Sequence, residues 1–305
     1  MRLPFVLVEL PGAPDPGGAA RWGAIDESLR YAQGVGASLV VFPECALTGY
    51  APWGPDPRLD VGATRAALVE RARATGVHLV LGWDAGDYCT LALATPGGTI
   101  HTYDKQHPTP TEAGRWRRGR SAGIVPTAFG RVGLLVCADV LHGRVWEALR
   151  GRVDLVVVAA AWPDYVGRLA HLPAALRPLA RPVTEGAGPW RDTLLARAAA
   201  SLGVPVVVCD ARGPLRAGDI AASAGTVEGF RAASGAWEGS GFPVPLTRAP
   251  EAGGGGEGVL VGQLVPGCTW SEAQVPRIDP GWRAFAGAYD GVARLRARFS
   301  RVHGA

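Results

Sequence analysis

Short apolar stretches rich in β-branched residues alternate along this chain with longer stretches rich in Ala, Arg and Leu. The short stretches favour buried strands, and the apolar residues three or four positions apart in the longer ones favour helices. This alternation predicts an α/β architecture. The predicted strands are residues 4–9, 38–42, 78–83, 88–95, 99–103, 130–136, 154–159 and 205–209, and the predicted helices are residues 19–33, 63–75, 144–150 and 190–202.

Turn-forming residues indicate how these elements connect. The PGG tripeptide at residues 96–98 predicts a hairpin within residues 87–104. The sequence APEAGGGGEG at residues 249–258 is of low complexity and predicts a loop outside any active site. A chain of 305 residues is compatible with one large α/β domain, which we place at residues 1–265. The tail, residues 266–305, predicts one helix over 280–299 that packs either on its own domain or on a partner subunit.

Composition and charge argue against several classes of protein. The formal net charge of +4 is too small and too evenly spread to indicate nucleic-acid binding. The five cysteines are widely spaced without a CxxC pair, so we predict neither a disulfide framework nor a metal site. No apolar run reaches the roughly 20 residues that span a bilayer, and the first strand, with Pro4 inside it and Glu9 at its end, is a poor secretory signal. We therefore expect a cytoplasmic protein that binds neither membranes nor nucleic acids.

Three chemically useful side chains follow predicted strands. Lys105 is the only lysine of the chain, and it comes after the strand that ends in TIHTYD; Glu44 follows SLVVFP and Cys137 follows RVGLLV. Ligand-binding groups converge at the carboxyl ends of strands in open α/β sheets, so this carboxylate, ammonium and thiol are expected to meet. A nearby ammonium and the start of a helix after Cys137 are expected to lower the pKa of its thiol. Taken singly, each residue also fits an ordinary role: a surface lysine, a solvated loop carboxylate and a buried small cysteine.

The three sequence blocks around these residues resemble the nitrilase superfamily of carbon–nitrogen hydrolases. The blocks are VVFPECALTGY, YDKQHPTPTEAGRW and GLLVCADVLHGRVWEALRGRVDLVVVAAAWP, and they occur in the order typical of that family. The resemblance extends over roughly residues 1–265. It implies a four-layer αββα sandwich, no cofactor and no catalytic metal, and dimers or larger homo-oligomers formed by packing sandwiches together.

The resemblance also implies a role for each matching residue. Cys137 would be the nucleophile, Glu44 the general base, and Lys105 the cation that stabilises the tetrahedral intermediate together with the backbone N–H of Ala138. Glu112 matches a second glutamate that supports the triad, through the pattern KxxPTxxE. Its alternative is an ordinary loop acid that pairs with Arg115 or Arg117.

Several aromatic and basic residues near the blocks are candidates for binding substrate. Trp162 and Tyr50 rank first among possible pocket-lining residues, followed by Trp116 and Trp53. Each of these aromatic residues fits the core equally well. The RWRRGR cluster, from Arg115 to Arg120, either recognises a substrate carboxylate or forms a solvated or subunit-facing loop.

The residues after the cysteine bear on the substrate class. Asp139 favours an amidase, whereas the small Ala138 departs from the aromatic residue usual there and enlarges the space beside the nucleophile. A further departure is Asp210, where the family often has Asn. We predict hydrolysis of a small-molecule carboxamide to an acid and ammonia through a Cys thioester. The alternatives are a nitrilase, an N-carbamoyl amide hydrolase and a non-enzymatic binding protein; acyl transfer and a synthetase-coupled glutaminase are less favoured.

Overall fold

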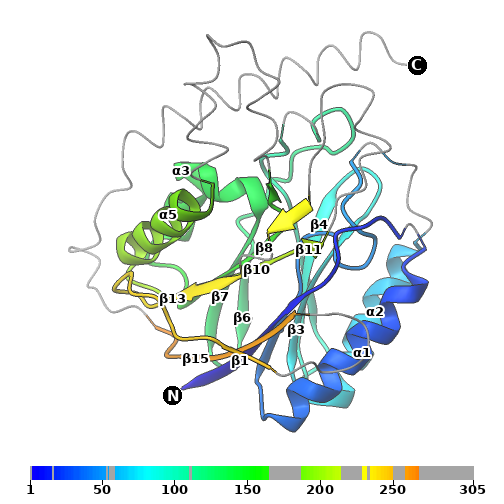
Figure 1. Ribbon diagram of the computed structural model, residues 1–305, viewed down its shortest axis with the longest axis horizontal. Helices are drawn as coiled ribbons and strands as arrows, with labels where there is room; N and C mark the ends of the chain where they lie inside the picture. The colour runs from blue at the N-terminus through cyan, green and yellow to red at the C-terminus, as the bar shows by residue number, and fades with distance from the viewer. Residues whose placement is uncertain are drawn as a thin grey trace.

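The computed structural model describes residues 2–15, 17–52, 54, 59–109, 112–164, 187–213, 229–231, 234–249 and 258–267. Within these residues two large β-sheets face each other, and helices cover the outer face of each (Figure 1). The predicted four-layer αββα sandwich is confirmed. The division of the chain at residue 265 stays a prediction, and the helix predicted over 280–299 lies outside the described residues.

The first sheet has the strand order β14-β15-β1-β2-β3-β4-β5. Its strands are β1 (Leu3–Glu9), β2 (Leu39–Val41), β3 (His78–Asp84), β4 (Cys89–Ala94), β5 (Ile100–Asp104), β14 (Thr247–Arg248) and β15 (Gly258–Leu264). Helices α1 (Ala19–Gly34) and α2 (Val61–Thr75) cover its outer face. β4 and β5 form the predicted hairpin, in which Leu91 pairs with Tyr103.

The second sheet has the order β13-β10-β8-β7-β6. Its strands are β6 (Ile124–Thr127), β7 (Gly130–Val136), β8 (Leu155–Ala160), β10 (Val206–Asp210) and β13 (Gly235–Trp237). Helices α3 (Gly143–Leu149) and α5 (Ala187–Leu202) lie on its outer side (Figure 1). A small third sheet joins β11 (Arg212–Gly213), β12 (Gly229–Arg231) and β9 (Pro163–Asp164).

The core explains why the strand sequences are almost continuously apolar. In β1, Leu3, Phe5 and Leu7 pack in the cluster between the two sheets. Val6 and Val8, which point to the opposite face, pack in the cluster beneath α1 and α2. A strand buried on both faces needs apolar residues at consecutive positions, not at every second one.

The helix ends follow local sequence rules, and the helices predicted over residues 19–33, 63–75, 144–150 and 190–202 are confirmed within a few residues. α2 begins two residues earlier than expected because Asp60 caps it: its carboxylate accepts the N–H of Ala63 at 2.9 Å. Gly76, with φ 72°, ends the same helix in the left-handed conformation. None of the helices in the described ranges is long and apolar enough to cross a membrane.

In the two large sheets, the described strands that the sequence pattern missed are the edge strands β6, β13 and β14, together with β15, which lies beside β14. β6, β13 and β14 are two to four residues long, too short to show a period. β15 pairs with β1 along its whole length, from Leu3 opposite Leu264 to Glu9 opposite Gly258. Gly258, the last residue of the loop predicted over 249–258, belongs to β15, and residues 250–257 of that prediction lie outside the described residues.

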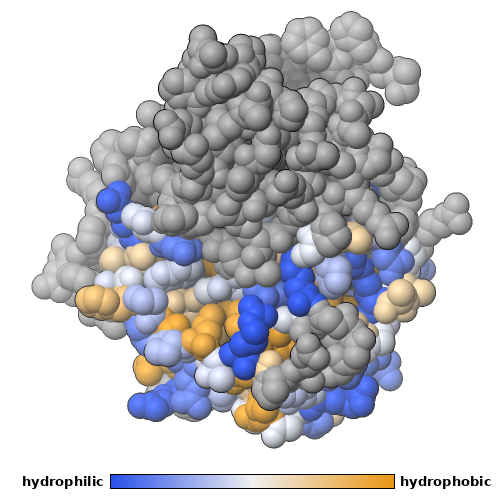
Figure 2. Space-filling model, in the orientation of Figure 1, coloured by the Kyte–Doolittle hydropathy of each residue, from blue (hydrophilic) through white to orange (hydrophobic). Residues whose placement is uncertain are grey.

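The surface visible in Figure 2 combines charged and apolar residues. In the same orientation as Figure 1, apolar residues gather where β13 and β15 lie, with polar residues around them. Phe242 and Val265 are the most exposed large apolar side chains among the described residues, at 72% and 50% exposure. Single exposed apolar residues of this kind are ordinary on protein surfaces.

Candidate active site

The strand ends bring the predicted residues together. Glu44 follows β2, Lys105 directly follows β5, and Cys137 directly follows β7. β5 runs parallel to β3 and β2, because two antiparallel pairings separate β5 from β3, so Glu44 and Lys105 leave their strands in the same direction. The sheets that carry them face each other, and the three side chains meet in the buried space between the sheets.

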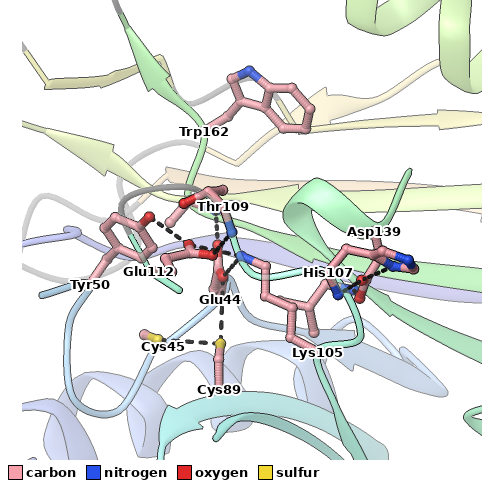
Figure 3. Close-up of polar contacts among 12 residues, drawn as sticks. Glu44, Cys45, Tyr50, Cys89, Lys105, His107, Thr109, Glu112, Asp139 and Trp162 are labelled. Carbon is pink, nitrogen blue, oxygen red and sulfur yellow. Dashed lines mark hydrogen bonds and ion pairs between the residues drawn. The ribbon is translucent and has the colours of Figure 1, made fainter. Parts of the chain in front are cut away.

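The centre of the site is the buried ammonium of Lys105 (Figure 3). Its Nζ donates to Oε1 of Glu44 at 2.7 Å and to Oε1 of Glu112 at 2.8 Å. All three side chains are fully buried. A buried charge is tolerated only when it is paired and hydrogen-bonded, and here one cation has two carboxylate partners. The backbone of Lys105 is held as well, since its N–H donates to the Cys89 carbonyl at 2.9 Å.

Both oxygens of Glu44 are occupied. Oε1 accepts from Lys105 and also from the Cys89 thiol, at 3.4 Å, and Oε2 accepts the backbone N–H of Ala161 at 3.1 Å. Ala161 follows β8, the strand beside β7, so this contact ties the carboxylate to the sheet that carries Cys137. The interpretation of Glu44 as a solvated loop acid is wrong.

Glu112 faces Lys105, and the alternative pairing with a neighbouring arginine is wrong. Its Oε1 accepts the Tyr50 hydroxyl at 2.6 Å and its Oε2 accepts the Thr109 N–H at 2.6 Å. Arg115 instead pairs with Asp84 at 2.8 Å and donates to the Gly54 carbonyl at 2.8 Å.

The remaining arginines of the cluster are exposed. Arg117, which is 70% exposed, pairs with Asp87 at 3.3 Å. Recognition of a substrate carboxylate by this cluster stays a prediction, although the guanidinium of Arg115 is already engaged by Asp84.

Cys137 occupies a sharp turn. It begins the short 3₁₀ helix η1 (Cys137–Leu141), and its φ of 45° lies in the left-handed region that residues with a Cβ rarely adopt. Such strained backbone clusters at functional sites, where the surrounding structure holds it in place. The cysteine is 5% exposed, and Ala138, whose N–H was predicted to bind an oxyanion, follows it in the same turn at 2% exposure.

Burial is the largest single influence on the pKa values of Glu44, Lys105 and Cys137. Burial raises the pKa of Glu44 to about 7, while Lys105 lowers that pKa, the like charge of Glu112 raises it, and hydrogen bonds from Lys105 and Cys137 lower it. For Lys105, burial lowers the pKa, but the carboxylates of Glu112 and Glu44 outweigh burial and the pKa lies well above its usual value. The site therefore keeps its ammonium charged, and Glu44 changes protonation state near neutral pH.

The expectation of a lowered thiol pKa at Cys137 is wrong. Burial, followed by the negative charge of Glu44, raises its pKa well above the usual value, and the opposing effect of the Lys105 ammonium does not compensate. A thiol in this environment is protonated at neutral pH, and it becomes a nucleophile only when a neighbouring base takes its proton.

The predicted aromatic residues occupy different positions around the cluster. Tyr50 and Trp116 are buried and meet edge to face, with centroids 6.0 Å apart, and Nζ of Lys105 lies 6.0 Å from the Trp116 ring. The observed contacts of both are thus to each other and to the charged residues. Trp162 is only half-buried, and Figure 3 shows its indole apart from the carboxylates, on the side opposite the Cys45 and Cys89 thiols. Substrate binding by these three residues stays a prediction, and Trp53 lies outside the described residues.

Sequence reasoning missed two supporting residues. Cys89 was noted only as an isolated cysteine, but its thiol lies 3.4 Å from Glu44 and 3.7 Å from the Cys45 sulfur. Asp210 was noted only as a departure from Asn, but it is buried and its Oδ1 accepts the backbone N–H of Trp162 at 2.9 Å. The position of Asp210 at the end of β10, beside β8, was the available signal.

No group of three or more His, Cys, Asp or Glu side chains within the described ranges is arranged to hold a metal ion. The absence of a metal and of a cofactor from the activity stays a prediction.

The site thus combines a fully buried carboxylate, a fully buried ammonium and a thiol at the strand ends of an αββα sandwich. This is the fold and the set of residues that the three sequence blocks predict. The carbon–nitrogen hydrolase family profile matches residues 17–225, more than half of the chain. The chain belongs to the carbon–nitrogen hydrolase family, as its three sequence blocks predict.

Individual relatives agree with this assignment. Omega-amidase YafV of Escherichia coli strain K12 is 30% identical over 141 residues, which cover 44% of this chain and 55% of that protein. This chain therefore matches about half the length of that curated relative. The crystal structure of an amidase from Nesterenkonia sp. superposes with a TM-score of 0.65 at 22% identity and covers 86% of this chain and 90% of its own. A cysteine-to-alanine mutant of the amidase from Nesterenkonia sp. AN1, in complex with butyramide, superposes with a TM-score of 0.64 at 22% identity and covers 86% of this chain and 91% of its own.

Proposed function

We propose that this protein is an amidase that hydrolyses a small carboxamide to the carboxylic acid and ammonia, with Cys137 as its nucleophile. The observation that carries the proposal is the buried Lys105 ammonium, held between Glu44 and Glu112 at 2.7 and 2.8 Å beside the cysteine. Such a site supplies a base, a nucleophile and a fixed positive charge within one desolvated space.

The first half of the proposed reaction forms a thioester. Glu44 takes the proton of Cys137 as the sulfur attacks the amide carbon, because the raised thiol pKa leaves little thiolate at rest. The Lys105 ammonium and the N–H of Ala138 hold the negative oxygen of the tetrahedral intermediate. Glu44 then returns the proton to the leaving nitrogen, the C–N bond breaks, and ammonia departs.

The second half releases the acid. Glu44, again a carboxylate, takes a proton from a water molecule that attacks the thioester carbon, and Lys105 again faces the oxyanion. The C–S bond breaks and the proton passes back to the sulfur, which restores the thiol. A base with a pKa of about 7 suits this repeated transfer, because both of its protonation states are populated near neutral pH.

Two observations favour an amide over the alternatives. Asp139 stands two residues after the cysteine, the position that favoured an amidase from sequence, and the relatives named above are an omega-amidase and an amidase. A nitrile or an N-carbamoyl amide would use the same three side chains. A cytoplasmic location and assembly as a homodimer or larger oligomer belong to the proposal as well.

The test is ammonia release from butyramide and butyronitrile, which share one acyl group. We expect release from the amide by the parent protein and none by Cys137→Ala. Cys209→Ala is the matched control, because Cys209 is equally buried but its thiol contacts the Val8 carbonyl, away from the cluster. Release from the nitrile alone would make the protein a nitrilase. Full turnover by Cys137→Ala, or no release by the parent from amide, nitrile or N-carbamoyl substrates, would overturn the proposal.

A further inference from the structure

A further fully buried carboxylate, Asp139, lies beside the cluster of Glu44, Lys105 and Glu112 and takes no part in the proposed chemistry. Its Oδ2 accepts the Tyr103 hydroxyl at 2.8 Å and the Val136 N–H at 3.1 Å. Its Oδ1 accepts the His107 N–H at 2.8 Å and lies 3.3 Å from Nδ1 of the same histidine (Figure 3). Both oxygens are therefore occupied by groups from other parts of the chain and from its own turn.

The donors to Asp139 come from the segment that carries Lys105 and the segment that carries Cys137. Tyr103 and His107 stand two residues before and two residues after Lys105. Val136 directly precedes Cys137, and Asp139 lies in the turn that Cys137 begins. One carboxylate thus links both sides of the lysine to the strained turn of the nucleophile.

We propose that Asp139 is a positioning residue for the proposed amide hydrolysis, one that fixes Lys105 and Cys137 relative to each other. The inference rests on the proposed function. An ammonium stabilises an oxyanion only where that oxygen will form, and a displacement of about 1 Å can cost a rate factor of about 100. Lys105 is otherwise tied to Glu44 and Glu112, and of these two Glu44 reaches the sheet that carries Cys137, through the backbone N–H of Ala161.

The contacts require a carboxylate at this position. Backbone N–H groups meet both oxygens of Asp139, from His107 on one and from Val136 on the other. An asparagine has one acceptor oxygen, so in either orientation its NH₂ group faces a backbone N–H. Asp139→Asn therefore keeps the shape of the side chain but loses one of its two backbone hydrogen bonds, to His107 or to Val136.

The experiment compares Asp139→Asn with Tyr103→Phe, which removes a single hydroxyl donor, and with Asp104→Asn as a matched control. Asp104 adjoins Lys105 and accepts the Thr90 hydroxyl at 2.7 Å, so its substitution makes the same charge change next to the lysine without touching Asp139. The kcat and KM for butyramide are measured for each variant. The rate and final extent of Cys137 alkylation by acrylamide are followed by mass spectrometry, and this second readout does not depend on turnover.

We expect Asp139→Asn to lower kcat about 100-fold with KM within about threefold of the parent, and Tyr103→Phe to lower kcat about tenfold. Alkylation of Cys137 should slow in both variants but still reach one adduct per chain, whereas Asp104→Asn should match the parent in every measurement. A final extent of alkylation well below one, with kcat falling in proportion, would instead mean that Asp139 only maintains the fold.

The proposal is overturned if folded Asp139→Asn keeps its kcat within threefold of the parent and its alkylation rate unchanged. If Asp139→Asn does not fold, Tyr103→Phe decides: parent-like kcat and alkylation overturn the proposal, and slowing of both supports it. If the parent hydrolyses no amide, the proposed function fails, but the alkylation rates still test whether Asp139 positions the ammonium beside the thiol.

Discussion

The charge of Glu112 is predicted to set the pH at which activity is lost on acidification. Glu44 must be a carboxylate to take the thiol proton, and its pKa is raised to about 7 chiefly by burial and further by the like charge of Glu112. In the parent, kcat/KM should therefore fall as the pH drops below about 7. Glu112→Gln removes the like charge while keeping the side-chain shape, so the acid limb of kcat/KM should move to lower pH.

The size of the expected pH shift follows from the positions of the Glu44 and Glu112 carboxylates. The two carboxylate oxygens bind the same ammonium at 2.7 and 2.8 Å. Two oxygens on one ammonium lie about 4.5 Å apart, where like charges repel by about 4 kcal/mol at an effective dielectric constant of 20. Since one pKa unit corresponds to about 1.4 kcal/mol, the repulsion sets an upper limit of about 3 pH units on the shift, and we expect at least about 1.

The assay is initial-rate ammonia release from butyramide between about pH 4.5 and 9, with kcat/KM fitted at each pH. The amide variant will also lower the maximal rate, because a Gln nitrogen cannot accept the Thr109 N–H, but the position of the limb is independent of that loss. Tyr50→Phe is the control: it removes the 2.6 Å hydrogen bond to Glu112 and leaves the charge, so its limb should stay near that of the parent. An acid limb of Glu112→Gln at the parent's pH or above it would refute this electrostatic reasoning.

Two further predictions concern single positions. Lys105→Arg should lower the rate of ammonia release at least about 100-fold, because a planar guanidinium does not fit the fully buried space between two carboxylates and cannot aim one charge at the oxyanion; parent-like activity would contradict the role of the ammonium. Gly49→Ala should lower the thermal melting temperature, since Gly49 has φ 73° and an added Cβ would collide with the backbone of Ala13 and Pro14, strain worth about 1–3 kcal/mol or more. Gly76→Ala, at φ 72° with open space around its Cβ position, is the control and should melt above Gly49→Ala; equal melting temperatures would show that the close approach at Gly49 contributes nothing.

The sequence predicted the elements whose residues are buried on a regular period. Strands such as β1 and β8 are nearly continuous apolar runs, and α1 and α2 place their apolar residues three or four apart, so pattern alone located them. β15 escaped prediction because it follows a glycine-rich stretch and contains Gly262 and Gln263. Its position depends on pairing with β1, and a partner about 250 residues away leaves no trace in a local pattern.

Some features of the site could likewise be predicted from local sequence, and others could not. Glu44, Lys105 and Cys137 were predicted to meet because each follows a strand, and the structure brings them together. The direction of the Cys137 pKa shift was predicted wrongly, because a sequence shows a neighbouring ammonium but not the degree of burial that outweighs it. Asp139 was read only as a marker of substrate class, since its contacts to Tyr103 and His107 arise from the packing of β5 beside the turn after β7.

The pairing of β15 with β1 has a consequence for the order in which the chain acquires its structure. β1 ends at Glu9 and is translated well before the strand that covers its free edge, which begins at Gly258. At about 5–20 residues per second, synthesis of the intervening chain takes roughly 12 to 50 seconds. During that time the unpaired backbone N–H and C=O groups along one edge of the apolar strand β1 are open to pairing with another nascent chain. Aggregation during expression is therefore expected to depend on how fast the residues between β1 and β15 are translated, a property unrelated to the stability of the finished fold.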